Sequence, residues 1–126
     1  MVRARRKPTP SELAILRVLW TRGPSTVREV AQALGRESAY TTVLKLMQIM
    51  KDKRLVRRDD SAPSHVYEAA CSEDDTQTQM VADLVDRAFG GSAAQLVLRA
   101  LSVGKVSPGE LAEIRKLLDT HRGGRR

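Results

Sequence analysis

The side chains with the clearest chemical potential lie close together, between Ser38 and Lys45. Hydroxyls at Ser38, Thr41 and Thr42 can exchange hydrogen bonds with base edges, and the Lys45 ammonium can reach guanine or a phosphate. A helix with such a face can enter the major groove of DNA and meet both bases and backbone. A solvent-exposed helix face has a similar composition, so both interpretations stay open for Thr41, Thr42 and Lys45.

The helix needed to position these groups is predicted by the segment 38–53. At about 100° per residue, Thr41 and Lys45 fall opposite a set of apolar residues. Tyr40 lies toward the apolar side, where it is either an aromatic at the edge of the core or a phosphate contact through its hydroxyl. The apolar set is Val43, Leu46, Met47 and Met50.

Two shorter helices are predicted before this segment. Residues Thr9 to Glu12 form a capping box with proline at the first helical position, and Gly23-Pro24 ends the apolar repeat that follows. Residues Thr26 to Glu29 form a second capping box, and Gly35 suits a left-handed C-terminal cap. Two helices, a tight turn and a third helix indicate a helix-turn-helix.

The segment after Lys53 changes to the pattern of strands. Residues 55–59 and 65–69 are predicted strands, and the turn formers of residues 60–64 separate them. Pro24 to Thr26 can add a third, minimal strand. A helix-turn-helix followed by such a hairpin predicts a winged helix.

Several basic side chains accompany this predicted domain. Arg57 and Arg58 occupy successive strand positions, so only one of them faces the same side as the helix and pairs with phosphate. Arg28 lies near the start of the second helix, where the helix dipole favours phosphate. Residues 5–7 are basic and could trail into an adjacent groove, although a disordered basic tail is the simpler interpretation.

The remainder of the chain predicts three helices. They are a helix over 73–89 capped by Ser72, a helix over 93–103 that is apolar nearly all round, and a Leu-rich helix opened by a capping box at Ser107. A frayed tail is expected from Arg122. The apolar helix must be covered, either by a second copy of the chain or within a compact monomeric bundle, and short helices favour the dimer. Expected dimer contacts are Met80, Leu84, Phe89, Leu98, Leu101, Leu111, Ile114 and Leu118.

The charge is divided unevenly along the 126 residues, whose net charge is +7. Residues 1–70 hold 14 Lys and Arg against 7 Asp and Glu, whereas residues 71–126 hold 8 against 8. The charge of residues 1–70 therefore favours binding to a polyanion, whereas that of residues 71–126 does not. We expect residues 1–70 to form the winged-helix domain, and residues 71–126 a helical dimerisation region.

The sequence lacks the motifs that would indicate other classes of function. Cys71 is the single cysteine, so neither a disulfide within one chain nor a structural zinc site is expected. The sequence has no phosphate-binding glycine loop, metal-ligand spacing or nucleophile elbow, so we expect no enzyme, cofactor or metal. Without an apolar run of membrane-spanning length or a signal-peptide pattern, a cytoplasmic protein is expected.

These motifs together resemble the penicillinase-repressor family of bacterial transcriptional regulators, of the BlaI, MecI and CopY type. The resemblance runs from Glu12 to Leu118. It is carried by Leu19-Trp20, Thr26-Val27-Arg28-Glu29-Val30, Ala39-Tyr40-Thr41-Thr42-Val43, Leu55-Val56-Arg57-Arg58, Val66-Tyr67, Phe89-Gly90-Gly91-Ser92 and the final Leu-rich helix.

The resemblance implies a homodimeric repressor on a near-palindromic operator, controlling genes such as those of a β-lactamase or a sensor protease. Several family members are inactivated by a protease that cleaves between Asn and Phe. Arg99 and Ala100 stand at that position here, so cleavage with that specificity is not expected. The chain ends in His121 to Arg126 without the cysteine motif of the copper-responsive branch, so copper sensing is not expected either. A winged helix that binds only other proteins remains the alternative function.

Overall fold

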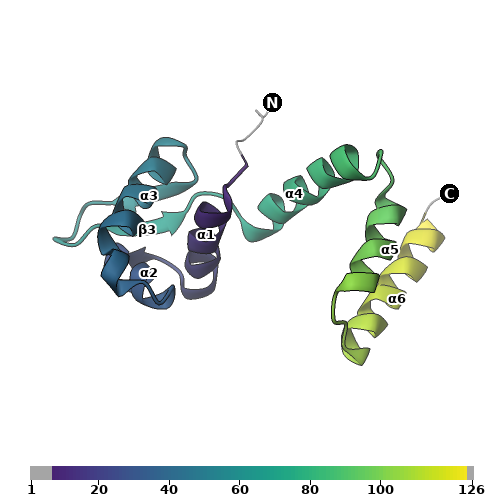
Figure 1. Cartoon of the computed structure of the whole chain (residues 1–126). Helices are drawn as coiled ribbons and strands as arrows, with labels where there is room; N and C mark the ends of the chain where they lie inside the picture. The colour runs from purple at the N-terminus through teal and green to yellow at the C-terminus, as the bar shows by residue number, and fades with distance from the viewer. Residues whose placement is uncertain (1–6, 125–126) are drawn as a thin grey trace. The chain divides into compact units, whose positions relative to one another are not determined.

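The computed structural model describes residues 7–124, mostly as helices (Figure 1). The chain forms two compact units, residues 1–81 and residues 82–126. The first unit contains three helices, a small sheet and the start of a fourth helix. The mainly helical composition with one three-stranded antiparallel sheet confirms the predicted fold class.

The first two helices, α1 (Pro10–Arg22) and α2 (Val27–Ala33), begin at the two predicted capping boxes. The Thr9 hydroxyl accepts a hydrogen bond from the Glu12 amide at 3.2 Å, and the Glu12 carboxylate accepts one from the Thr9 amide at 3.0 Å. Each box satisfies amide groups that the helix itself leaves unpaired. Gly35 follows α2 with φ at 69°, the left-handed conformation expected of it.

The segment predicted as one helix over 38–53 contains two helical types. A 3₁₀ turn, η1 (Glu37–Ala39), precedes α3 (Tyr40–Asp52), so Ser38 lies before α3 rather than in its first turn. The physical reason is the missing cap. Ala39 at the N-cap position has no side chain to bond the first amides, and the Tyr40 amide bonds the Glu37 carbonyl instead.

The sheet contains β1 (Ser25–Thr26), β2 (Val56–Asp59) and β3 (Val66–Ala69) in the order β1-β3-β2. The hairpin and the minimal third strand are therefore confirmed. Tyr67 on the central strand pairs with Ser25 on one side and with Arg58 on the other. Along β2, Val56 is buried, Arg57 exposed and Arg58 half-buried, so Val56 and Arg58 share the inner face of the sheet.

The core of the first unit fills the space between these helices and the sheet. Its largest fully buried side chains include Ile15, Leu16, Met47, Met50, Leu55 and Tyr67. At the edge of this core, the Trp20 indole nitrogen donates to the Cys71 carbonyl at 2.9 Å. That bond ties α1 to the segment that follows β3.

One carboxylate lies inside this core. Glu12 is 2% exposed, and its Oε2 lies 2.7 Å from the Lys53 ammonium at the C-terminal end of α3. Burial raises the pKa of Glu12, but the hydrogen bonds from Lys53 and Thr9 and the Lys53 charge outweigh it, so the pKa lies below its ordinary value. The pair joins the start of α1 to the end of α3, a connection that sequence analysis missed.

The C-terminal part of the chain contains α4 (Glu73–Ala88), α5 (Ala93–Val103) and α6 (Pro108–Gly124). The predicted caps are present, because the Ser72 hydroxyl accepts from the Asp75 amide at 3.0 Å and the Ser107 hydroxyl accepts from the Glu110 amide at 3.1 Å. α6 continues through Gly124, and the last two residues of the expected tail, Arg125 and Arg126, lie outside the described residues.

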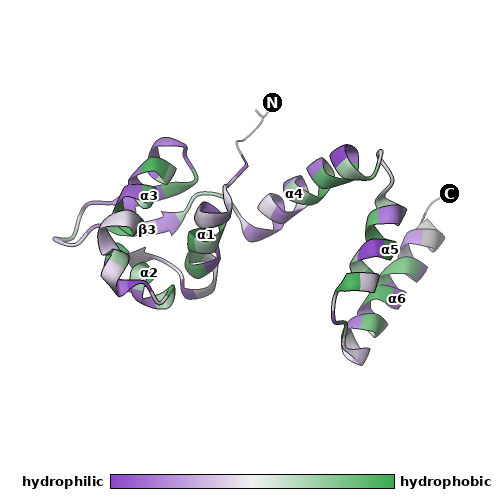
Figure 2. Cartoon of the chain, viewed as in Figure 1, coloured by the Kyte–Doolittle hydropathy of each residue, from purple (hydrophilic) through white to green (hydrophobic). Residues whose placement is uncertain are grey.

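The apolar helix α5 differs from its expected environment. None of its residues is buried among the described residues, and Leu98 and Val103 are 57% and 83% exposed. Figure 2 shows strongly hydrophobic residues along α5 and α6. Its own unit offers only α6 and part of α4 as neighbours, too few elements to cover a helix that is apolar on most sides. The prediction of a buried helix is therefore not met within this unit.

Candidate nucleic-acid interface

The outer face of α3 carries the side chains predicted to read DNA. Thr41, Thr42 and Lys45 are exposed, and among residues 7–124 none of the three side chains forms a hydrogen bond or ion pair. Val43 and Met47 on the opposite face are buried in the core. Packing of one face thus holds α3 in place while the other face stays available to a ligand.

Tyr40 and Arg28 lie together beside this face. Tyr40 is half-buried and packs against the core, as expected of an aromatic at its edge. The Arg28 guanidinium carbon stands 5.0 Å from the centre of the Tyr40 ring, a cation–π distance. Ser38, in η1, is exposed close to Tyr40 in the chain. The structure thus gives Arg28 a fixed position next to the start of α3.

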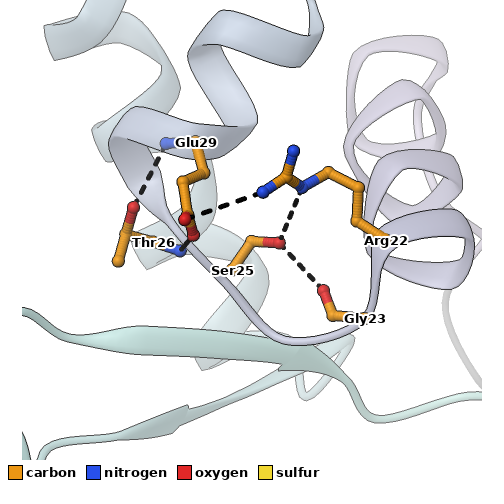
Figure 3. A network of polar contacts seen from close by, with 5 residues as sticks. All are labelled: Arg22, Gly23, Ser25, Thr26 and Glu29. Atoms are coloured by element: carbon orange, nitrogen blue, oxygen red, sulfur yellow. Dashed lines mark hydrogen bonds and ion pairs between the residues drawn. The ribbon is translucent and has the colours of Figure 1, made fainter.

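A polar network sets the position of α2, on which Arg28 stands (Figure 3). The Thr26 hydroxyl accepts from the Glu29 amide at 3.1 Å, and the Arg22 Nε donates to the Ser25 hydroxyl at 3.4 Å. That hydroxyl in turn donates to the Gly23 carbonyl at 2.9 Å. Arg22 also lies 3.6 Å from the Glu29 carboxylate. The network links the end of α1 to the start of α2 through Ser25, which is buried and was not identified from the sequence.

The two arginines of the hairpin have different environments. Arg57 is exposed on the outer face and pairs with Glu68 across the strands at 3.3 Å. Arg58 shares the inner face with Val56, and its side chain is 24% exposed. Arg58 is therefore the arginine on the helix side of the sheet.

A carboxylate of the turn holds Arg58. The Arg58 Nε lies 2.7 Å from the Asp60 Oδ1, which is an ion pair without the alignment of a hydrogen bond. The Arg58 Nη2 donates a hydrogen bond to the other Asp60 oxygen at 3.3 Å. The Tyr67 hydroxyl and then Asp60 raise the pKa of Arg58, so this side chain stays charged.

A hollow of about 400 Å³ separates the helix-turn-helix from the wing. Arg28 and Tyr40 line it from the helices, and Ser64 and His65 line it from the hairpin. The remaining lining residues are Thr26, Val27, Leu44, Pro63 and Tyr67. The hollow brings one cation, one imidazole and several hydroxyl groups together, a set that suits an anionic group such as a phosphate.

Apolar side chains form a second candidate surface in the C-terminal helices. Of the dimer contacts predicted from sequence, Leu84, Leu98, Leu101, Leu111 and Leu118 are exposed, and Met80, Phe89 and Ile114 are half-buried. Four further apolar residues of these helices are exposed and were not among the predicted dimer contacts: Val81, Val97, Val103 and Leu117. Their apolar side chains were the sequence feature that could have identified them.

Other predicted features give no site. Arg5 and Arg6 lie outside the described residues, and Lys7 is exposed. Within residues 7–124, no three His, Cys, Asp or Glu side chains gather to hold a metal ion. Across the same residues, none of the helices combines the length and apolar character of a membrane span.

Comparison with known families gives a match over nearly the whole chain. A family model described as penicillinase repressor matches residues 8–120. The chain belongs to the penicillinase repressor family. Membership confirms the resemblance seen in the sequence. Because the family consists of transcriptional regulators, it also confirms that the chain is not an enzyme.

Two curated relatives support this membership. Both are named Transcriptional regulator BlaI and come from two strains of Mycobacterium tuberculosis. Each is 36% identical over 92 residues, which cover 69% of this chain and 65% of the relative. The chain thus spans slightly less than two thirds of the length of these two relatives.

Proposed function

We propose that this chain is a transcriptional repressor that binds double-stranded DNA as a homodimer on a near-palindromic operator. The observation that carries the proposal is the exposed, unpaired face of Thr41, Thr42 and Lys45 at the start of α3. Family membership and the regulator names of both relatives support it.

Base reading is assigned to the first turns of α3. The major groove of B-DNA is about 12 Å wide and admits an α-helix, whose N-terminal residues then meet the base edges. Thr41, Thr42 and Lys45 are the exposed side chains at that end. Threonine can bond a base and pack its methyl on thymine, and Lys45 can bond guanine, so these residues supply specificity.

Phosphate binding is assigned to the hollow and the wing. A backbone phosphate in the hollow would meet Arg28 and the Tyr40 hydroxyl on one side and Ser64 and His65 on the other. Arg58 continues this basic surface along the hairpin. The excess of 14 Lys and Arg over 7 Asp and Glu in residues 1–70 favours binding to a polyanion.

Dimerisation is assigned to the C-terminal helices. Nine of the ten large apolar side chains exposed in the described chain lie between Val81 and Leu118, which marks this part as the surface to be covered. A second copy supplies a matching surface by two-fold symmetry. Two winged helices then bind two half-sites, which accounts for a near-palindromic operator. The family description supports the proposal that the controlled genes are of the β-lactamase or sensor-protease type.

A mobility-shift experiment tests this function. The full chain is titrated into DNA from upstream of its own gene at physiological salt, with excess non-specific competitor, and into a scrambled duplex of equal length. The proposal predicts a shift of the upstream DNA that survives the competitor. Equal binding to both duplexes, or none, would favour a winged helix that binds proteins instead.

A further inference from the structure

The turn of the wing contains two neighbouring carboxylates with different partners. Asp59 accepts a hydrogen bond from the Ser61 amide at 2.9 Å and so closes the turn locally. Asp60 lies near side chains on both sides of the turn, 2.7 Å from the Arg58 Nε and 3.7 Å from the His65 Nε2. In the free protein, Asp60 thus engages the arginine on the helix side of the wing.

This arrangement places a negative charge within a surface assigned to phosphate. Arg58 lies on the inner face of the hairpin, and His65, the other partner of Asp60, lines the hollow. A phosphate that approached Arg58 would therefore meet the Asp60 carboxylate at close range. Two anions that share one guanidinium repel each other, so each binds it less well than it would alone.

The pair is also weak enough to be displaced. The Asp60 side chain is 54% exposed, and ion pairs exposed to this degree contribute little to stability. A phosphate of double-stranded DNA gains in addition the release of condensed counterions when a cation neutralises it. A DNA phosphate can therefore compete with Asp60 for the Arg58 guanidinium at little cost to the stability of the wing.

We propose that Asp60 competes with the DNA backbone for Arg58 and thereby lowers the affinity of the wing for DNA of any sequence. Because phosphate contacts carry no sequence information, weakening them lowers the affinity for operator and for non-specific DNA alike. Asp60 thus sets how tightly the wing binds DNA without changing which sequence is preferred. This inference rests on the proposed function.

The salt dependence of Asp60→Asn binding tests the inference. Where Asp60 still holds Arg58 in the wild-type complex, the variant frees this arginine for one more phosphate, so log Kd should depend more steeply on log salt, by at most about 0.9. Over a fourfold change in salt, a slope increase of about 0.9 makes the affinity gain at 50 mM about 3.5-fold larger than at 200 mM. The gain should be the same for operator and scrambled DNA.

Asp59→Asn is the matched control, because it removes the same charge one residue away while its amide oxygen can still accept from Ser61. It should give a smaller gain than Asp60→Asn, and the Asp60→Asn gain should shrink to the size of the Asp59→Asn gain when Arg58 is replaced by Gln. Equal gains in the two Asn variants, or an Asp60→Asn gain that keeps its full size without Arg58, would overturn the competition. Weaker binding of Asp60→Asn would overturn it too, because Asp60 would then position Arg58. Failure of the wild-type chain to bind DNA would remove the proposed function itself, and this inference with it.

Discussion

Replacement of Lys53 by Met should destabilise the winged-helix unit more than any exposed lysine change. Lys53 is the ion-pair partner of Glu12, whose side chain is 3% exposed, and the substitution leaves that carboxylate buried without a cation. Breaking a buried pair costs about 3–5 kcal/mol. Because the Lys53 side chain is 26% exposed, we expect the lower end, about 3 kcal/mol in the free energy of unfolding at pH 7.

The pH dependence of this loss gives a second readout. The lowered pKa of Glu12 means that its stabilisation is fully present above its ordinary value of 4.5 and is lost as pH falls through the lowered folded value. In Lys53→Met, burial remains and the Lys53 bond is gone, so the pKa of Glu12 rises. The gap in stability between wild type and variant should therefore narrow as pH falls below 4.5.

Equilibrium urea unfolding, followed by the fluorescence of the single tryptophan, measures both quantities. Trp20 lies in α1 and bonds the Cys71 carbonyl, so its emission reports on this unit. Lys51→Met is the control, since Lys51 is exposed on the same helix and has no ion pair with another described residue. The Glu12–Lys53 pair would not stabilise the unit if Lys53→Met lost no more free energy of unfolding than Lys51→Met. The same conclusion would follow if the difference in stability between wild type and Lys53→Met stayed constant on acidification.

Two further predictions concern the cap of α2 and the dimer. Thr26→Ala removes the N-cap that places Arg28, and it should lower the free energy of unfolding by about 1 kcal/mol in the same urea assay; an unchanged midpoint would show that the cap is dispensable. Leu98→Asp puts a charge on the exposed apolar surface of α5 and should prevent dimerisation. Light scattering at micromolar concentration should give the wild type twice the chain mass of 14.0 kDa and the variant the mass of a single chain. A wild-type species of 14.0 kDa would contradict the dimer.

Local patterns in the sequence predicted most of the fold. The capping boxes at Thr9 and Thr26 depend on residues three positions apart, and strand alternation identified the hairpin that carries Arg58. Such features are decided within one turn or one hairpin, where side chain and backbone meet regardless of the rest of the chain. The resemblance to the penicillinase repressor family was visible for the same reason.

Features that depend on distant residues were not predictable in this way. Glu12 and Lys53 are 41 positions apart, and nothing near either residue signals the other. The partner of Arg58 is only two residues away, but the sequence offers several carboxylates and no geometry to choose among them. The exposure of α5 depends on which elements surround it, which hydrophobic periodicity does not report.

The proposed function depends most on base reading by α3, and the affinity of Lys45→Ala for operator and scrambled DNA tests base reading most directly. If Lys45 contacts a base, operator binding should weaken by about 1–3 kcal/mol, with relaxed preference at that position and little change on scrambled DNA. A uniform loss with a flatter salt dependence would reassign Lys45 to phosphate. If neither the operator affinity nor its salt dependence changed, α3 would not enter the groove at Lys45. That result would contradict base reading by α3.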